Sequence, residues 1–178
     1  FRSAQLQSLT GGPLNALDTS DVAAMSVEQI GNLTAAQMGQ LSTGTLNALT
    51  NAQLQSFSAA QLAGLTTSQM KGLTTDNLQA LTTAQFKALS AAQVNGITAA
   101  NIAKIQTQDL AALTANTISA LATATAAGLS TDQIQALTQS QLSAMGSSQL
   151  NALTDLTKLS TAQLSALKGD QLAKLTSA

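Results

Sequence analysis

The sequence contains no cysteine, histidine, tryptophan or tyrosine, and only 8% of its 178 residues are charged. Without cysteine and histidine there can be no disulfides, thiol chemistry, Cys/His zinc sites or imidazole acid–base catalysis. We therefore expect that the protein is not an enzyme, and the sequence identifies no catalytic, cofactor-binding or metal-binding residue. It also leaves any ligand-binding residues unknown.

Two further absences restrict the partners. The formal net charge is −1 and no basic stretch occurs, so a nucleic acid or an anionic membrane is not expected to bind. No apolar run approaches the roughly 18 residues that a membrane span requires. Apolar residues nevertheless make up 44% of the chain, which favours folding over disorder.

An eight-residue repeat fills the chain and reads approximately Leu-Thr-Thr-Ala-Gln-Leu-x-Ala. With Phe1 as position one, position one is apolar in every unit from Leu9 to Leu153, and position six from Leu6 to Leu150. The unit 153–158 has lost two residues, and the repeat resumes at Leu159. We interpret 1–178 as a single repeat array and expect it to be a segment of a longer protein.

The octapeptide predicts one short helix in each repeat. Eight residues at about 100° each overshoot two helical turns by roughly 80°, so a continuous helix could not keep both apolar positions on one face. Position two is usually Ser or Thr and position five usually Gln, as in Thr34 and Gln37, which is the spacing of a capping box. Positions one and six match a hydrophobic staple, and acids gather in the proposed first turns.

These features together predict an all-α solenoid, a superhelix of about 22 short capped helices. Isolated helices this short are marginal in water, so consecutive units must bury positions one and six against each other. Position eight is mostly Ala or Gly, as at Gly64 and Gly96, so that neighbouring helices can approach closely. The pattern does not predict the handedness or the number of repeats per superhelical turn.

Several units depart from the pattern. The cap hydroxyl is replaced at Gln106, Ala122, Gly146 and Lys168, and the glutamine is replaced by threonine at Thr45, Thr117 and Thr125. Unit 121–128 lacks both groups and carries the small Ala126 at position six. We expect the least stable stretch of the array there.

The recurring Leu-Thr-x-x-Gln, as at 33–37, 49–53 and 81–85, resembles the octapeptide arrays of very large bacterial surface or secreted proteins, labelled adhesins or haem-utilisation/adhesion proteins. The resemblance covers essentially the whole chain and implies a secreted or cell-surface element. The same motif is similar to that of the periplasmic Spy/CpxP stress proteins, where it lies on longer helices and forms no unbroken array. We attribute that second match to shared capping.

The leading functional hypothesis is a stalk or filament-forming element of a bacterial surface protein. We expect head-to-tail self-association, because both ends interrupt the array. The nearly uncharged surface favours lateral association as well. The alternatives are an α-solenoid module that binds a glycan or peptide, and a threonine-rich face that binds ice. A row of glutamines could also present amides to a polysaccharide, and a β-rich, amyloid-like fold is a further alternative.

Overall fold

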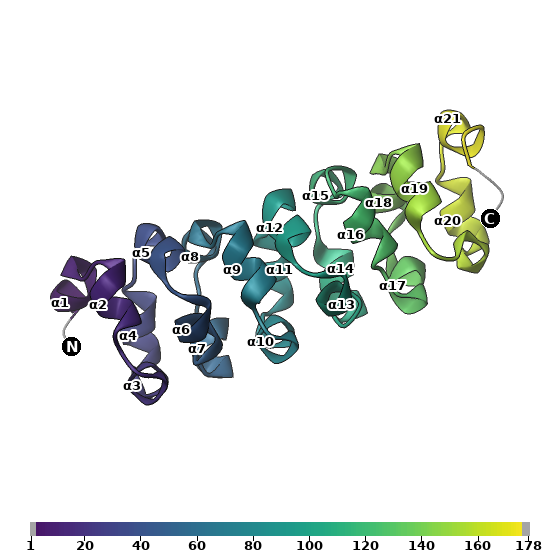
Figure 1. Cartoon of the computed structure of the whole chain (residues 1–178). Helices are drawn as coiled ribbons and strands as arrows, with labels where there is room; N and C mark the ends of the chain where they lie inside the picture. Colours follow the sequence, from purple (N-terminus) through teal and green to yellow (C-terminus); the bar gives the residue numbers. More distant parts are fainter. Residues whose placement is uncertain (1–2, 176–178) are drawn as a thin grey trace.

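The computed structural model describes residues 3–175 and forms an elongated rod of short helices (Figure 1). Over this range it has 21 α-helices of four to six residues, one 3-10 helix and no strand. The elements are α1 Ser3–Ser8, α2 Gly11–Asn15, α3 Thr19–Ala24, α4 Val27–Gly31, α5 Ala35–Gln40, α6 Thr43–Asn47, α7 Asn51–Gln55, α8 Ala59–Gly64, α9 Thr67–Gly72, α10 Thr75–Ala80, α11 Thr83–Ala88, α12 Ala91–Gly96, α13 Ala99–Ile102, α14 Thr107–Ala112, α15 Ala115–Ser119, α16 Thr123–Ala127, α17 Thr131–Ala136, α18 Gln139–Ala144, α19 Ser147–Ala152, η1 Leu156–Lys158, α20 Thr161–Ser165 and α21 Gly169–Leu172. The all-α solenoid is confirmed, and the β-rich alternative is wrong.

Many of the helices begin at the predicted capping box. In α5 the Gln37 backbone N–H donates to the Thr34 hydroxyl at 3.2 Å, and the Thr34 N–H donates to the Gln37 amide oxygen at 2.9 Å. The helix ends at Leu41, which is extended at φ −63° and ψ 139°, and Ser42 is extended as well. Two extended residues therefore separate α5 from α6. No described residue other than glycine has a positive φ, and no described glycine has one either.

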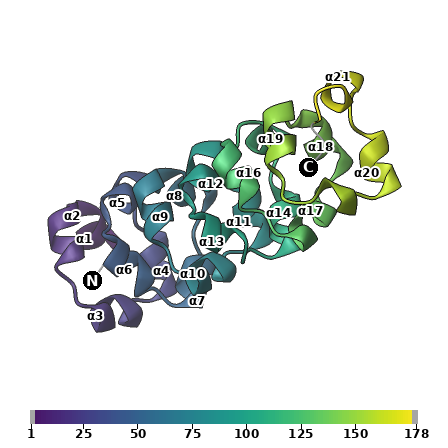
Figure 2. The same ribbon diagram turned by 45° about the vertical axis from the view of Figure 1, so that its right-hand side comes forward.

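Successive helices wind into a superhelix, which two views of the rod show from different sides (Figures 1 and 2). The closest packing joins each helix to the third one further along the chain, as α5 to α8, α9 to α12 and α15 to α18. A superhelical turn therefore takes between three and four repeats. Our expectation that position-one and position-six side chains pack between consecutive units needs correction, because the main partner of a helix is on the next superhelical turn.

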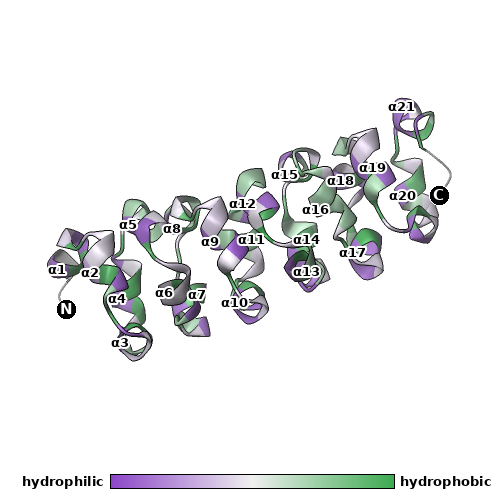
Figure 3. Cartoon of the chain, in the orientation of Figure 1, coloured by the Kyte–Doolittle hydropathy of each residue, from purple (hydrophilic) through white to green (hydrophobic). Residues whose placement is uncertain are grey.

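Positions one and six build one continuous core along the rod. Buried members of this cluster extend from Leu14 to Leu167, and every helix carries both hydrophobic and hydrophilic residues (Figure 3). At the C-terminal end Leu164 and Leu172, which belong to the position-six series, are instead 43% and 48% exposed. The expectation that position six is buried is wrong for these two residues, because no further turn within residues 3–175 packs over them.

Position eight is small because two superhelical turns touch there. A Cβ atom added to Gly96 would lie 2.7 Å from the backbone oxygen of Thr67, and one added to Gly64 would collide with the backbone of Ala35. In both cases the partner lies 29 residues earlier in the chain. The predicted close approach is confirmed, between successive turns.

Candidate functional site

The most regular polar feature of the rod is a line of buried glutamines, which we call the glutamine ladder. Its members occupy position five of the repeat or the equivalent place after the six-residue unit. They are Gln37, Gln53, Gln61, Gln69, Gln85, Gln93, Gln133, Gln141, Gln149, Gln163 and Gln171. Each of them accepts a hydrogen bond through Oε1 from the backbone N–H three residues earlier. The bond persists where Gly146 or Lys168 replaces the cap hydroxyl.

The amide nitrogen of each ladder glutamine donates to the preceding superhelical turn. Gln93 Nε2 donates to the carbonyl oxygens of Leu62 at 2.6 Å and Leu65 at 3.0 Å, which lie 31 and 28 residues earlier. Gln133 repeats the pattern with Ile102 at 2.7 Å and Ile105 at 2.8 Å. These carbonyls lie at the C-terminal end of a helix, where backbone acceptors lack partners inside the helix.

One side chain thus completes two helix ends at once. Its oxygen serves the N-terminus of its own helix, and its nitrogen serves the C-terminus of a helix on the previous turn. The capping interpretation is confirmed, and the hypothesis of an amide row open to a polysaccharide is wrong, because the ladder amides are buried and bonded on both sides. The sequence analysis missed the role of the nitrogen.

The six-residue unit 153–158 shortens the ladder spacing without breaking it. Its residues form η1 instead of an α-helix. Beyond it, Gln171 Nε2 donates to Leu142 and Met145, 29 and 26 residues earlier, so both separations are two residues shorter than elsewhere. The superhelix therefore absorbs the shorter unit within one turn.

A second, outer set of amides occupies position seven and connects a turn to the following one. Asn95 Nδ2 donates to the Ala120 carbonyl at 3.1 Å, and Asn95 Oδ1 accepts from the Ala122 N–H at 2.8 Å. Asn47 makes the same pair of bonds with Gly72 and Thr74. Such an asparagine acts like a short piece of backbone between two turns, and the sequence analysis did not single it out.

The acids follow the helix ends. Hydrogen bonds from the Ser20 hydroxyl and from the Asp21 backbone N–H lower the pKa of Asp18, which caps α3. The Thr157 hydroxyl, its backbone N–H and Lys158 lower the pKa of Asp155. Among residues 3–175 no group of three or more His, Cys, Asp or Glu side chains could hold a metal ion.

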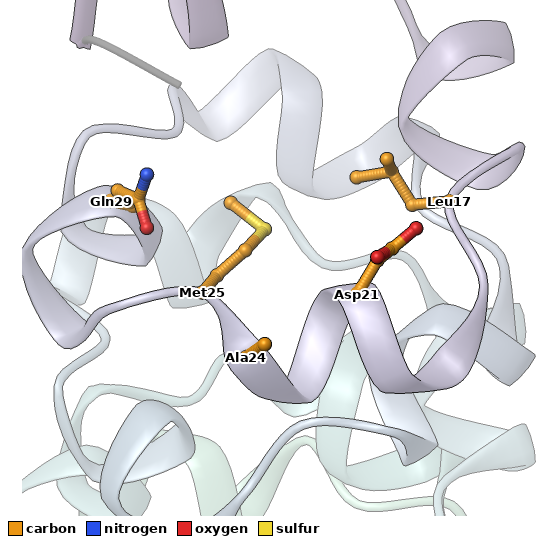
Figure 4. Close-up of a pocket in the computed structure, with 5 residues that line it drawn as sticks. All are labelled: Leu17, Asp21, Ala24, Met25 and Gln29. Atoms are coloured by element: carbon orange, nitrogen blue, oxygen red, sulfur yellow. The ribbon is translucent and has the colours of Figure 1, made fainter.

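The N-terminal end of the rod carries an open pocket of about 410 Å³ (Figure 4). Leu17 and Met25 extend into it from opposite sides, with Asp21 beside Leu17 and Gln29 beside Met25 (Figure 4). Leu17 and Met25 are position-one residues that are only partly buried, unlike their counterparts further along the chain. Position-one side chains are therefore accessible at this end, and position-six side chains at the other.

None of the helices in the described part of the chain is long and apolar enough to cross a membrane. The geometry defines the class of protein as an all-α tandem-repeat solenoid. The chain belongs to the ALTTAQ repeat family, whose pattern matches residues 14–51, 38–75, 73–104 and 102–139, together well over half of its length. No curated protein matches it.

Proposed function

We propose that the array is a structural element, a stiff spacer that holds other parts of a protein apart, and that it has no enzymatic activity. The observation that carries the proposal is the continuous core from Leu14 to Leu167, which joins all turns into one body. The ladder supports the same role, because its polar groups are used to join turn to turn. A protein whose repeated polar side chains form internal hydrogen bonds is suited to mechanical support.

The distance between two exposed sites tests the spacer. The chain has no natural cysteine, so spin labels can be attached at Gln55→Cys and Gln135→Cys, both exposed positions on different turns. A single narrow distance distribution is expected for a stiff rod. A broad distribution would overturn the proposal, and scattering that gives the radius of gyration of a compact domain, about 16 Å for this length, would do the same.

We further propose a secreted or bacterial cell-surface location and an adhesive or filament-forming role. The support is the resemblance of the Leu-Thr-x-x-Gln repeat to arrays of large bacterial surface proteins. Detection of the full-length protein on intact cells with an antibody against the array tests the location. Labelling that requires cell lysis would contradict it.

Head-to-tail assembly is the form of self-association that the two end surfaces favour. At the N-terminal end the position-one residues Leu17 and Met25 are only partly buried, and at the C-terminal end Leu164 and Leu172 of the position-six series are exposed. The exposed Leu164 and Leu172 of one copy would enter the pocket beside Leu17 and Met25 of another. This contact is proposed between two copies of the 178-residue chain.

Sedimentation velocity at increasing concentration tests this assembly. Leu164→Asp and Leu172→Asp are expected to abolish concentration-dependent growth without unfolding the rod, because both side chains are already exposed. Val27→Asp is the matched control, since Val27 is 46% exposed and lies outside the pocket. Equal association of all three variants would contradict the assigned contact.

A binding module for a glycan or peptide is the second candidate. The observation that favours it is an open surface pocket of about 300 Å³ lined by hydroxyl, amide and ammonium groups of Thr67, Ser68, Asn95 and Lys71. Binding of a glycan that Lys71→Ala abolishes would support it. Ice binding receives less support, because threonines at position two, such as Thr66 and Thr82, use their hydroxyls as helix caps.

A further inference from the structure

Four consecutive repeats, covering residues 97–128, have no glutamine at position five. The residues there are Asn101, Asp109, Thr117 and Thr125. Because a ladder glutamine reaches 28 to 31 residues back, these four repeats are about one superhelical turn. One complete contact between two turns therefore lacks the ladder, and we call this contact, between residues 70–97 and 101–128, the glutamine-free seam.

The shorter side chains replace the ladder bonds only in part. Asn101 Nδ2 donates to the Leu73 carbonyl at 3.0 Å, and the Thr117 hydroxyl donates to the Leu89 carbonyl at 3.3 Å. Thr125 makes no bond to the described residues of the turn before it. A ladder glutamine makes two or three bonds to the preceding turn through Nε2 alone. Asn101 reaches two only because its Oδ1 also accepts from the Thr75 hydroxyl at 3.0 Å, and Thr117 makes one.

Asp109 stands in the ladder position without an amide group. Its carboxylate is buried, and one carboxylate oxygen accepts from the Thr83 hydroxyl at 2.6 Å. Asp109 has no N–H group, so it lacks the amide donor with which glutamine serves the helix-end carbonyls in other units. The bond at Asp109 joins two side chains and supplies no donor to the backbone carbonyls at the end of the helix on the preceding turn.

Two of the four helices of the seam also lack a side-chain cap, whereas Thr98 and Thr114 cap the other two. Neither Gln106 nor Ala122 makes a side-chain cap bond to α14 or α16. The unit with the uncapped α16 has the small Ala126 at position six, although Ala126 is fully buried. Losses at the helix ends and losses between the turns therefore fall on the same repeats.

Outer polar bonds and apolar packing still hold the seam closed. Asn95 bridges to Ala120 and Ala122, and Gln79 Nε2 donates to the Lys104 carbonyl at 2.8 Å. These bonds are mainly exposed to solvent, where water competes for the same groups. Turns on both sides are better fixed, by Gln85 and Gln93 before the seam and by Gln133, Gln141 and Gln149 after it.

We infer that the glutamine-free seam is an internal joint, the place inside the rod where neighbouring turns separate first. When the turns separate, helices α13 to α16 lose the packing that keeps such short helices formed. In a loaded stalk the seam would lengthen before the braced turns do. That use rests on the proposed spacer function, whereas preferential opening is a property of the array alone.

Hydrogen exchange of the whole chain, followed by mass spectrometry near neutral pH, tests the joint. Amides of α13 to α16 are expected to exchange on the order of tenfold faster than those of α7 and α8 and of α17 and α18, because each missing bond changes the opening equilibrium by several-fold. The double variant Thr117→Gln and Thr125→Gln should reduce the difference.

The opposite substitutions cover the case in which the longer side chains do not fit. Gln85→Thr with Gln93→Thr should create a second fast-exchanging region at α10 to α12 and leave α17 to α18 unchanged. Uniform exchange through the interior of the wild-type rod would overturn the joint, as would the absence of a new fast region in this variant. A narrow spin-label distance together with uniform exchange would reject the joint and keep the spacer.

Discussion

Repeats 57–64 and 121–128 lie in two different turns and differ in nearly every stabilising group. In the first, Ser58 caps the helix and Gln61 donates to the Ile30 carbonyl at 2.8 Å and the Leu33 carbonyl at 2.9 Å. In the second, Ala122 provides no cap bond and Thr125 stands in the ladder position. Both nevertheless form a short helix.

The comparison shows that a repeat without cap or ladder can take its shape from the turns around it. α16 packs between α13 and α19, and its Ala126 is as fully buried as the leucines of other units. In a repeat array, neighbours supply part of the stability of each unit. The difference between the two repeats should therefore appear in stability and in local opening more than in conformation.

The largest difference is expected at position eight, which is glycine in both repeats, Gly64 and Gly128. Gly64→Ala should lower the free energy of unfolding by about 3 kcal/mol, because the new methyl group collides with the Ala35 backbone. Gly128→Ala should change it by less than about 1 kcal/mol, because a Cβ atom there would lie 3.0–3.1 Å from Ile102 and Ala99, which need to shift only slightly, and alanine favours the helix. Chemical denaturation of both variants measures the difference.

Gly31→Ala is the control for the glycine pair. A Cβ atom there meets nothing within 4 Å, so the substitution should stabilise the chain by about 0.5–1 kcal/mol. Equal losses at Gly64 and Gly128 would show that the two contacts do not differ as described.

Removing the ladder from the braced repeat comes next in size. Gln61→Thr should cost about 2 kcal/mol, since the Ile30 and Leu33 carbonyls lose their donor inside the rod. Thr125→Ala should cost clearly less, and Gln55→Thr, at an exposed position, should be nearly neutral. Urea midpoints at a constant slope test the order, and an equal loss for Gln55→Thr and Gln61→Thr would contradict it.

Exchanging the caps is expected to make the stabilities of the two repeats more similar. Ala122→Ser adds a hydroxyl that can accept from the Thr125 N–H and should stabilise the chain by about 1 kcal/mol. Ser58→Ala removes the corresponding bond and should cost a similar amount. Thermal unfolding of the two variants should show shifts of opposite sign, and shifts of the same sign would refute the comparison.

The smallest expected effect is that of acid. The folded-state pKa values of Asp18 and Asp155 lie below their ordinary value of 3.8, so their contribution is complete above that value and is lost as the pH falls below it. Asp18 is exposed and Asp155 is half-buried, and both lie outside the two compared repeats. Asp18→Asn should weaken the fall in stability below about pH 4 and leave the pH dependence of stability near neutrality unchanged.

Titration of the unfolding midpoint between about pH 2 and 7 measures this dependence. If Asp18→Asn altered the slope of the midpoint against pH near neutrality, that result would conflict with the lowered pKa.

Much of the helical structure could be predicted from the sequence, because its signals are local. Thr34 and Gln37 are three residues apart, and their reciprocal bonds follow from that spacing alone. The packing could not be predicted in the same way. The partners of Gln93 lie 28 and 31 residues earlier, and an eight-residue period does not by itself determine which earlier unit returns to its side.

The functional surface was less accessible to sequence reasoning. Position-seven asparagines such as Asn95 recur too irregularly to mark a pattern, although they bridge turns as the glutamines do. The exposure of Leu164 and Leu172 depends on which turns lie over them, and their place in the repeat is the same as that of buried residues. Unit 121–128 was expected to be weak, and the structure places it in a whole turn without the ladder.

Exchange of the glutamine side-chain amide protons tests the central claim most directly, since the claim is that Nε2 joins successive turns. The protons of Gln133, Gln141 and Gln149, followed by nuclear magnetic resonance, are expected to exchange far more slowly than those of the exposed Gln55 and Gln135. Equal exchange rates in the two groups would mean that the glutamines cap their own helices without joining the turns.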